Sequence, residues 1–379
     1  MLRTAAHTLL VLTLVCWGGH APASDGPETL EQLGERLFFD VNLSANRTQA
    51  CASCHDPENG FADPRGMASP GDDGVSLGDR NAPTAAYAAF SPTFHKTAEG
   101  EWIGGQFLDG RAASLEDQAG GPPLNPAEMG MPDKASVLAR LREDVVYLEA
   151  FTKLFSKTVL DDPETGYAAM TQAIAAYERS PALNAFDSKY DRYLRGEAEL
   201  TREEELGLTL FFSEQFTNCN QCHQVGRSPI NPQETFTNYR FHNIGTPENL
   251  ALRQMNGVAT GTIDEGLAAN PAVDGAASER GKFRTPTLRN VAVTGPYMHN
   301  GIFEELRTVV LFYNIYNTRS EARLINPETG APFGPPQVAD TLSIEELEHG
   351  PALDDQRIDA LVAFLKTLTD ARYEHLLED

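Results

Sequence analysis

The sequence predicts a mainly helical protein built from two related halves, on three observations. The segment L-G-x-x-L-F-F occurs twice, at residues 33–39 and 206–212, and each copy precedes a C-x-x-C-H motif. Apolar residues recur at helical spacing in several longer segments, whereas strand signals are few. Pro- and Gly-rich stretches at 120–133 and 325–336 are interleaved with apolar residues, which indicates ordered loops.

The helical segments can be placed in order along the chain. The first repeat copy, residues 33–39, is expected to be helical, and residues 135–154 have the apolar spacing of an amphipathic helix. Residues 167–177 give another helix, and the second repeat copy at 206–212 follows it. Residues 354–368, DDQRIDALVAFLKTL, give the last one, which is expected to pack on the second C-x-x-C-H site. The 379 residues are comfortable for two domains, and we place the boundary near 165–185.

The N-terminus has the pattern of a secretory signal peptide. Arg3 supplies a positive charge, residues 9–15 form a short apolar run, and Ala21-Pro22-Ala23 offers a cleavage site. The apolar run is too short to span a bilayer, so a retained membrane anchor is the less favoured alternative. We expect an exported, periplasmic chain that begins near residue 24 and has no membrane span.

The chain is strongly acidic. It has 30 Lys and Arg against 54 Asp and Glu residues, and removal of the leader takes away one basic residue and no acidic one. The mature chain therefore has a formal charge of −25. This argues against nucleic acid and anionic membrane surfaces as partners and suits a basic or neutral protein.

All four cysteines outside the leader belong to the C-x-x-C-H motifs Cys51–His55 and Cys219–His223. This motif attaches a c-type haem: its two thiols bond to the porphyrin and its histidine ligates the iron. Zinc sites usually combine C-x-x-C with a second pair or with distant histidines. A thioredoxin-like redox pair would not need a histidine after the second cysteine twice. The two motifs therefore predict two covalent haems, held by Cys51, Cys54, His55, Cys219, Cys222 and His223.

The opposite face of each haem decides its function, because an axial Met or His closes it and an open face lets peroxide bind. Candidate ligands are few near the first motif. His95 is the only other histidine between His55 and the helical middle region, and Met67 is the only methionine between Cys54 and Met129. One haem therefore has few obvious sixth ligands.

Several stretches resemble the bacterial di-haem cytochrome c peroxidases, and within them the MauG-like branch. They run from about residue 30 to the C-terminus, and the last of them and the stretch GGQF…NPAEM are the most specific. The matching stretches are CASCHDPENGFADPR, GDRNAPT, GGQFLDGRAASLEDQAG, PLNPAEM, FDSKYDR, FTNYRFHNIG and RTPTLRNVAVTGPYMHNGIFEELRTVVLFYN.

The resemblance implies an all-α fold of two cytochrome c-like domains with long ordered loops. Residues 1–23 would be the signal peptide, 24–175 the N-terminal domain and 176–379 the C-terminal domain. The His55 haem would be high-spin and bind peroxide, and the His223 haem would be low-spin and store an oxidising equivalent.

The resemblance also implies an axial ligand for the second haem. Ordinary family peroxidases have a methionine after an H-[DN]-G motif, where this chain has Tyr313, and MauG-like members also have tyrosine there. Periodicity alone favours Tyr313 as a core aromatic on an amphipathic helix. Met298 and His299 remain alternative ligands.

The first haem is implied to be open at rest. Ordinary family peroxidases have a capping histidine just before the N-A-P-T segment, but GVSLGDRNAPT contains none. MauG-like distal residues match Glu128 as the acid–base group that moves the peroxide proton, Gln118 as the residue that orients peroxide and Pro122 as the residue that shapes the pocket. From the residues alone, a surface amide, a loop proline and a solvated carboxylate would be the simpler interpretations.

The family further places a calcium ion between the domains, and the matching positions are Asn81, Thr294 and Pro296. Side-chain and backbone oxygens suit this hard cation, although the sequence has no conventional Ca²⁺ loop.

Two positions depart from the MauG-like pattern. Leu108 stands where those members have a tryptophan between the haems, and Thr217 stands where they have one near the protein-substrate surface. Indoles can carry charge by hopping, whereas Leu and Thr cannot. Phe107, beside Leu108, is harder to oxidise than an indole, and Trp102 is the only tryptophan outside the leader.

Three functions follow for comparison. The first is a MauG-like enzyme that uses hydrogen peroxide to oxidise a partner protein at a distance, as in tryptophan-derived cofactor maturation in a methylamine dehydrogenase precursor. The second is a conventional peroxidase that takes electrons from a small c-type cytochrome or cupredoxin. The third is a non-enzymatic electron carrier with both haems closed. The missing capping histidine and Glu128 speak against the third function. Tyr313 favours the first function over the second, and Leu108 and Thr217 weaken that preference without reversing it.

Overall fold

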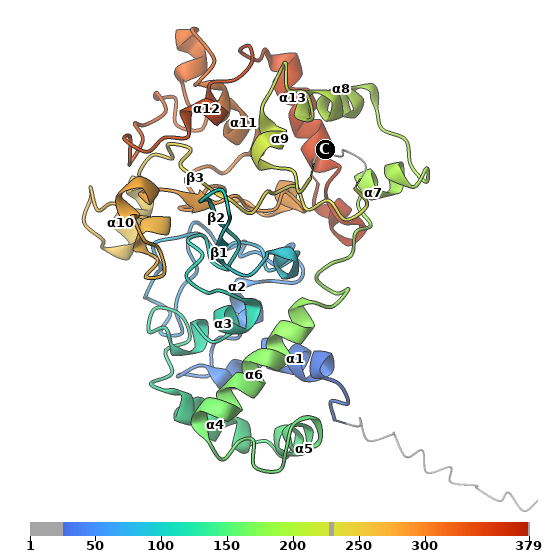
Figure 1. Ribbon diagram of the computed structural model, residues 1–379, viewed down its shortest axis with the longest axis vertical. Coiled ribbons are helices and arrows are strands. Elements are labelled where there is room, and N and C mark those ends of the chain that lie inside the picture. Colours follow the sequence, from blue (N-terminus) through green and yellow to red (C-terminus); the bar gives the residue numbers. More distant parts are fainter. Residues whose placement is uncertain (1–25, 227–230, 378–379) are drawn as a thin grey trace, which may run out of the picture.

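The structure is a computed structural model that describes residues 26–226 and 231–377. Its helices fall into two groups that lie one above the other in Figure 1, the N-terminal group below in blue to green and the C-terminal group above in green through yellow to red. The predicted signal peptide, residues 1–23, and its cleavage near Ala23 lie outside the described residues. The helices of the N-terminal half are α1 (Leu30–Phe38), α2 (Cys51–Cys54), α3 (Leu115–Ala119), α4 (Lys134–Arg142), α5 (Val145–Leu154) and α6 (Pro163–Glu178).

The C-terminal half is also mainly helical, and strands are confined to two short antiparallel pairs in the described chain. The expected helical fold is therefore confirmed with that small addition. The helices are α7 (Lys189–Leu194), α8 (Arg202–Phe211), α9 (Cys219–Cys222), α10 (Leu250–Asn256), α11 (Leu306–Asn314), α12 (Ile344–Leu347) and α13 (Asp355–Lys366). The strands are β1 (His95–Lys96) with β2 (Trp102–Ile103), and β3 (Phe241–His242) with β4 (Phe283–Arg284).

The repeated L-G-x-x-L-F-F segment forms a helix in both halves, and its glycine allows a close helix crossing. In α1, a Cβ on Gly34 would lie 1.9 Å from the backbone oxygen of Ala173 in α6. In α8, a Cβ on Gly207 would lie 1.9 Å from the backbone oxygen of Ala360 in α13. Only glycine fits at such a distance, so the repeat encodes the same helix pair twice.

Each helix pair is the centre of its own hydrophobic core. The α1–α6 core runs from Leu33 to Leu183, and the α8–α13 core runs from Tyr190 to Leu368. The buried residues Leu361 and Leu365 of α13 also border the cavity that contains the second C-x-x-C-H motif. The predicted boundary between 175 and 176 lies inside α6, and its position stays a prediction.

The segment 135–154 differs from the single amphipathic helix expected for it. It forms α4 and α5, which meet at Glu143 and Asp144. The Asp144 carboxylate accepts a hydrogen bond from the Val146 backbone N–H at 2.9 Å and so caps the start of α5. An aspartate cap competes with helix continuation, which explains why apolar spacing alone did not reveal the break.

Backbone and side-chain contacts join the two halves. Ile103 in β2 bridges to Arg240 beside β3, and the Arg284 backbone N–H donates to the Leu108 carbonyl at 2.8 Å. The Arg80 guanidinium binds the Asp264 carboxylate at 2.7 Å. No helix in the described ranges is long and apolar enough to cross a membrane.

Candidate functional site

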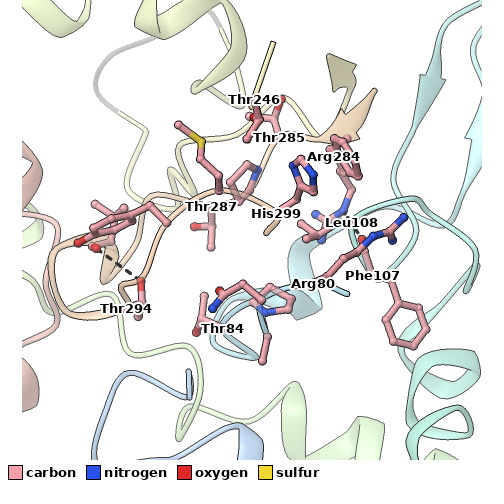
Figure 2. A pocket seen from close by; sticks show the side chains of 18 of the residues that line it. Arg80, Thr84, Phe107, Leu108, Thr246, Arg284, Thr285, Thr287, Thr294 and His299 are labelled. Atoms are coloured by element: carbon pink, nitrogen blue, oxygen red, sulfur yellow. Dashed lines mark hydrogen bonds between the residues drawn. The ribbon is translucent and has the colours of Figure 1, made fainter. Parts of the chain in front are cut away.

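A cavity of about 930 Å³ lies between the two halves and is lined by both C-x-x-C-H motifs. Figure 2 shows side chains around it, with Arg80 and Leu108 from the N-terminal half and Arg284 and His299 from the C-terminal half. The sequence therefore places its four motif cysteines and two motif histidines around one shared space, rather than at two separate surfaces.

The first motif forms α2 and ends at His55. The His55 backbone N–H donates to the Cys51 carbonyl at 2.9 Å, which closes the turn. On its ring, His55 Nδ1 lies 3.3 Å from the Phe61 carbonyl oxygen. Burial lowers the pKa of His55, so the ring is neutral, and an Nδ1–H bonded to the carbonyl leaves Nε2 free as an acceptor.

The second motif repeats this geometry in α9. The His223 backbone N–H donates to the Cys219 carbonyl at 2.8 Å, and His223 Nδ1 lies 3.1 Å from the Phe236 carbonyl oxygen. Burial lowers the pKa of His223 to about 4. All four cysteines of the described chain are free thiols. Two free thiols beside a neutral, oriented imidazole are the donor set that a covalent haem requires, so the residues at both motifs fit this group.

The three distal residues predicted near the first motif line the same cavity. Gln118 lies on α3, and Pro122 and Glu128 lie in the loop that follows α3. Asn125 Nδ2 donates to Glu128 Oε1 at 2.8 Å. Burial raises the pKa of Glu128, against the opposing influence of Asn125 and Arg111. A desolvated carboxyl with a raised pKa is suited to proton transfer near neutral pH, unlike the solvated loop carboxylate that was the simpler interpretation.

His95 lies apart from this cavity. It is exposed on β1, and its Nδ1 lies 2.7 Å from the Thr93 carbonyl oxygen. It is absent from the residues that line the cavity in the described chain. The segment between His55 and Glu128 therefore contributes no histidine to the cavity wall.

Sequence reasoning missed Glu178, a second carboxyl in the cavity wall. It is 5% exposed at the end of α6, and within the described chain its buried Oε2 has no hydrogen-bond partner. Burial raises its pKa to about 8. A glutamate on the apolar face of the segment 163–178 was the only signal in the sequence that could have revealed it.

We expect Glu178→Gln to stabilise the protein in a pH-dependent way. The folded-state pKa of about 8 lies above the ordinary value of 4.5, so unfolding releases a proton when the pH lies between these two values. Wild type therefore loses stability as pH rises through this interval, by up to about 1.4 kcal/mol for each pH unit, and the amide does not. Thermal unfolding followed by circular dichroism should show an advantage of the variant that grows until about pH 8.

Glu164→Gln is the matched control, because Glu164 lies on the same helix with an exposed side chain that pairs with Lys134. Its melting temperature relative to wild type should vary little with pH. An advantage of Glu178→Gln that is constant across the interval would contradict the raised pKa.

Tyr313 lies on α11 and borders the cavity beside the second motif. Burial raises its pKa, and the neighbouring Cys222 and Cys219 thiols add to this effect. Met298 and His299 border the same cavity. The His299 ring is stacked on Phe283 with centroids 3.7 Å apart.

The three residues predicted to hold calcium, Asn81, Thr294 and Pro296, also line the cavity. Asn81 Nδ2 donates to the Met67 carbonyl at 3.3 Å, which leaves the side-chain oxygen of Asn81 available. The described residues contain no group of three or more His, Cys, Asp or Glu side chains placed to hold a metal ion.

The two positions that depart from the MauG-like pattern are both buried. Leu108 is 9% exposed in the cavity wall. Thr217 is 5% exposed, and its hydroxyl donates to the Leu210 carbonyl at 2.5 Å. Phe216, by contrast, is 43% exposed. The residue directly before Thr217 is thus more exposed than Thr217 itself, whose hydroxyl is bound to the backbone of α8.

The comparisons with known proteins agree with this geometry. The model of the family described as "Di-haem cytochrome c peroxidase" matches residues 28–199. The methylamine utilization protein MauG of Paracoccus denitrificans is 52% identical over 100% of this chain and 98% of its own length. The cytochrome c551 peroxidase of Pseudomonas aeruginosa is 30% identical over 75% of this chain and 71% of its own length.

The fold is also similar to that of a solved di-haem peroxidase structure. The di-haem peroxidase BthA of Burkholderia thailandensis superposes with a TM-score of 0.81 at 32% identity, covering 92% of this chain and 87% of that one.

Proposed function

This chain belongs to the di-haem cytochrome c peroxidase family as a MauG-like oxidoreductase, and from this premise we propose that it uses hydrogen peroxide at an open haem to oxidise a partner protein at a distance. The observation that carries the proposal is the 52% identity to a MauG over the whole chain. The cavity supports it, because both C-x-x-C-H motifs and the three distal residues border one space.

The family carries two haems, and we assign their attachment to the two motifs. Cys51 and Cys54 would bond one porphyrin and His55 would ligate its iron; Cys219, Cys222 and His223 would do the same for the other. A bound haem supplies an iron that exchanges single electrons and activates peroxide. The Phe61 and Phe236 carbonyls fix the ring orientations of the two histidines.

We expect the purified protein to exceed the mass of its mature chain by two haem groups. The reason is that each motif offers two free thiols and an oriented imidazole. Intact-protein mass spectrometry measures this, and the double variant Cys219→Ser/Cys222→Ser should lose one haem. A wild-type mass with a single haem, or with zinc in its place, would refute the assignment.

At the first haem, the residues would divide the work on peroxide. Glu128 Oε2, the oxygen that Asn125 leaves free, would take a proton from the near peroxide oxygen and deliver it to the far one. The Gln118 amide would orient the peroxide by hydrogen bonding, and Pro122 would limit the space around it. With His95 at the surface, no histidine of the segment between His55 and α4 would cap this face.

At the second haem, the Tyr313 phenol would supply an oxygen ligand to the iron in addition to the His223 imidazole. A phenolate is anionic and stabilises oxidised iron better than a thioether does. Met298 and His299 are the alternative ligands, and the stacking of His299 on Phe283 favours Tyr313 over His299.

A calcium ion would be held near the domain junction by oxygens of Asn81, Thr294 and Pro296, with waters completing its coordination. The two halves meet at this cavity, so such an ion would fix their relative position. An exported, periplasmic location follows from the leader and suits the covalent attachment of haem.

A conventional peroxidase reaction is the second candidate function. Leu108 and Thr217 favour it, because neither side chain can relay charge as an indole does. In that reaction a small c-type cytochrome or cupredoxin would deliver electrons, and the formal charge of −25 after leader removal would favour a basic donor.

Mass spectrometry of the protein partner separates the two functions. The chain would be incubated with peroxide and either a methylamine dehydrogenase precursor or a reduced small c-type cytochrome. A MauG-like function requires added oxygen or a new tryptophan cross-link in the precursor, and Leu108→Trp should speed that change. Rapid oxidation of the cytochrome with an unmodified precursor would instead establish the conventional peroxidase.

A further inference from the structure

Arg284 is a cationic side chain in the cavity that the proposed function leaves without a role. It lies on β4, where it pairs with Phe241 of β3. Its backbone N–H donates to the Leu108 carbonyl at 2.8 Å. Its side chain borders the cavity next to Leu108, as Figure 2 shows. The residue therefore lies where the two halves meet.

The Arg284 guanidinium has no counter-charge in the described chain. Its one hydrogen bond there is from Nε to the Phe107 carbonyl, at a long 3.4 Å. The other three cavity-lining arginines are all paired: Arg80 with Asp109 and Asp264, Arg253 with Asp79 and Glu248, and Arg111 with Asp109. Arg284 is thus the exception among the described arginines of this wall.

An unpaired guanidinium at this depth is costly. Its side chain keeps some accessible surface because it borders the cavity, and enclosure by the surrounding protein lowers its pKa to about 10. It is therefore still charged at neutral pH. The neighbouring Tyr239 does not offset the charge, because burial raises its pKa to about 12 and its hydroxyl is bonded to Thr235 at 2.7 Å. A buried charge of this kind requires an anion.

We propose that Arg284 binds a carboxylate of a haem at the junction of the two halves. The inference rests on the proposed function, since it takes the two haems as the occupants of this cavity. The haem edge carries carboxylates, and a guanidinium matches their two oxygens with a fork of N–H groups. Two nitrogens of Arg284, Nη1 and Nη2, have no protein acceptor in the described residues and are available for such a pair.

The pairing would also influence electron transfer. A fixed positive charge beside a haem carboxylate favours the reduced iron over the oxidised iron, because reduction removes one positive charge from the centre. Arg284 is bonded through its backbone and its Nε to the Phe107–Leu108 segment. It would therefore influence the electrostatic potential at a haem beside this segment of the cavity wall.

The test is the reduction potential of each haem in Arg284→Gln, measured by spectroelectrochemical titration. We expect the equilibrium constant for reduction of one haem to fall by roughly tenfold, which is about 59 mV for one electron, with the other haem less affected. Arg284→Lys should recover part of the loss. The matched control is Arg240→Gln, which removes the same charge from an exposed side chain paired with Glu101.

The outcomes are distinguishable. A protein without two haems refutes the proposed function. Two haems with equal potentials in Arg284→Gln and Arg240→Gln overturn the carboxylate pairing. Wild-type potentials that change when phosphate or chloride is removed from the buffer would show a free anion at Arg284 and would overturn it too.

The wild-type protein provides a second measurement if neither variant of Arg284 accumulates with haem. Resonance Raman spectra contain propionate bending bands, which shift when the carboxylate accepts hydrogen bonds. At least one band at the hydrogen-bonded position supports the pairing, and bands that all match solvated carboxylates overturn it.

Discussion

Replacing Glu128 with glutamine should slow the reaction of the protein with hydrogen peroxide by a factor of about 10² to 10⁴, the usual contribution of a positioned acid–base group. The amide keeps the shape of the side chain and the hydrogen bond to Asn125, but it cannot take up a proton. Stopped-flow mixing with peroxide measures the rate from the change in haem absorbance. The absorption spectrum before mixing should be nearly unchanged.

The rate of the peroxide reaction should also depend on pH in a defined direction. Burial raises the pKa of Glu128, and only the ionised form can accept the peroxide proton. The wild-type rate should therefore fall as pH decreases through that raised pKa, and the Glu128→Gln rate should lack this step. Asn125→Ala removes a hydrogen bond that lowers the pKa of Glu128, so the step should move to higher pH.

Glu116→Gln is the control for the loss of one carboxylate near the first motif. Glu116 is on α3, and its carboxylate pairs with Arg179 at 2.7 Å. The control should react at the wild-type rate. Equal rates for Glu128→Gln and wild type would show that water or another group carries the proton. Gln118→Leu should have a smaller effect, because one neutral hydrogen bond contributes only about 0.5–1.5 kcal/mol.

Replacing Tyr313 with phenylalanine should abolish the low-spin signal of one haem and leave the other haem unchanged. Phenylalanine preserves the packing of α11 and removes only the oxygen that would bind iron. Burial raises the pKa of Tyr313, so its phenol stays protonated unless a metal ion lies against the oxygen. Electron paramagnetic resonance should therefore show the low-spin component replaced by a high-spin one.

Tyr316→Phe separates ligation from the general loss of a hydroxyl group. Tyr316 follows α11, and its hydroxyl donates to the Ile244 carbonyl at 3.0 Å. This variant should keep the low-spin signal. If Tyr313→Phe keeps it as well and Met298→Leu loses it, Met298 is the ligand and the assignment to Tyr313 is wrong.

The fold could be predicted from the sequence mainly where a repeated pattern or a single residue type determines the local geometry. The repeat with Gly34 and Gly207 predicted two related halves from the recurring order of helix and C-x-x-C-H motif, and the structure shows that both glycines permit a close helix crossing. The break at Asp144 was not predicted, since the apolar spacing continues across it. The repeat is visible as a local sequence pattern, whereas the helix break depends on a hydrogen bond from a backbone N–H to the Asp144 side chain.

The site was predictable for a different reason, and only in part. The C-x-x-C-H motifs indicate haem attachment because their functional residues are close together in the sequence. Gln118, Pro122, Glu128 and Tyr313 were predicted from the family resemblance, and all four line the cavity. Glu178 and Arg284 have no such motif. Both residues are enclosed by segments that are distant in the sequence. This enclosure removes water from the Glu178 carboxyl and leaves the Arg284 guanidinium without a carboxylate partner in the described chain.

The paired helix crossings have a consequence for how the chain is completed. In each half the helix before the C-x-x-C-H motif crosses one that comes long after it, α6 for the first half and α13 for the second. The first half can therefore close with the helices up to α6, whereas the second half requires α13. Premature termination before Asp355 would therefore yield a protein with one closed half and one open half. Without α13, the second core would lose the partner against which α8 packs at Gly207, while the first core would keep both of its helices.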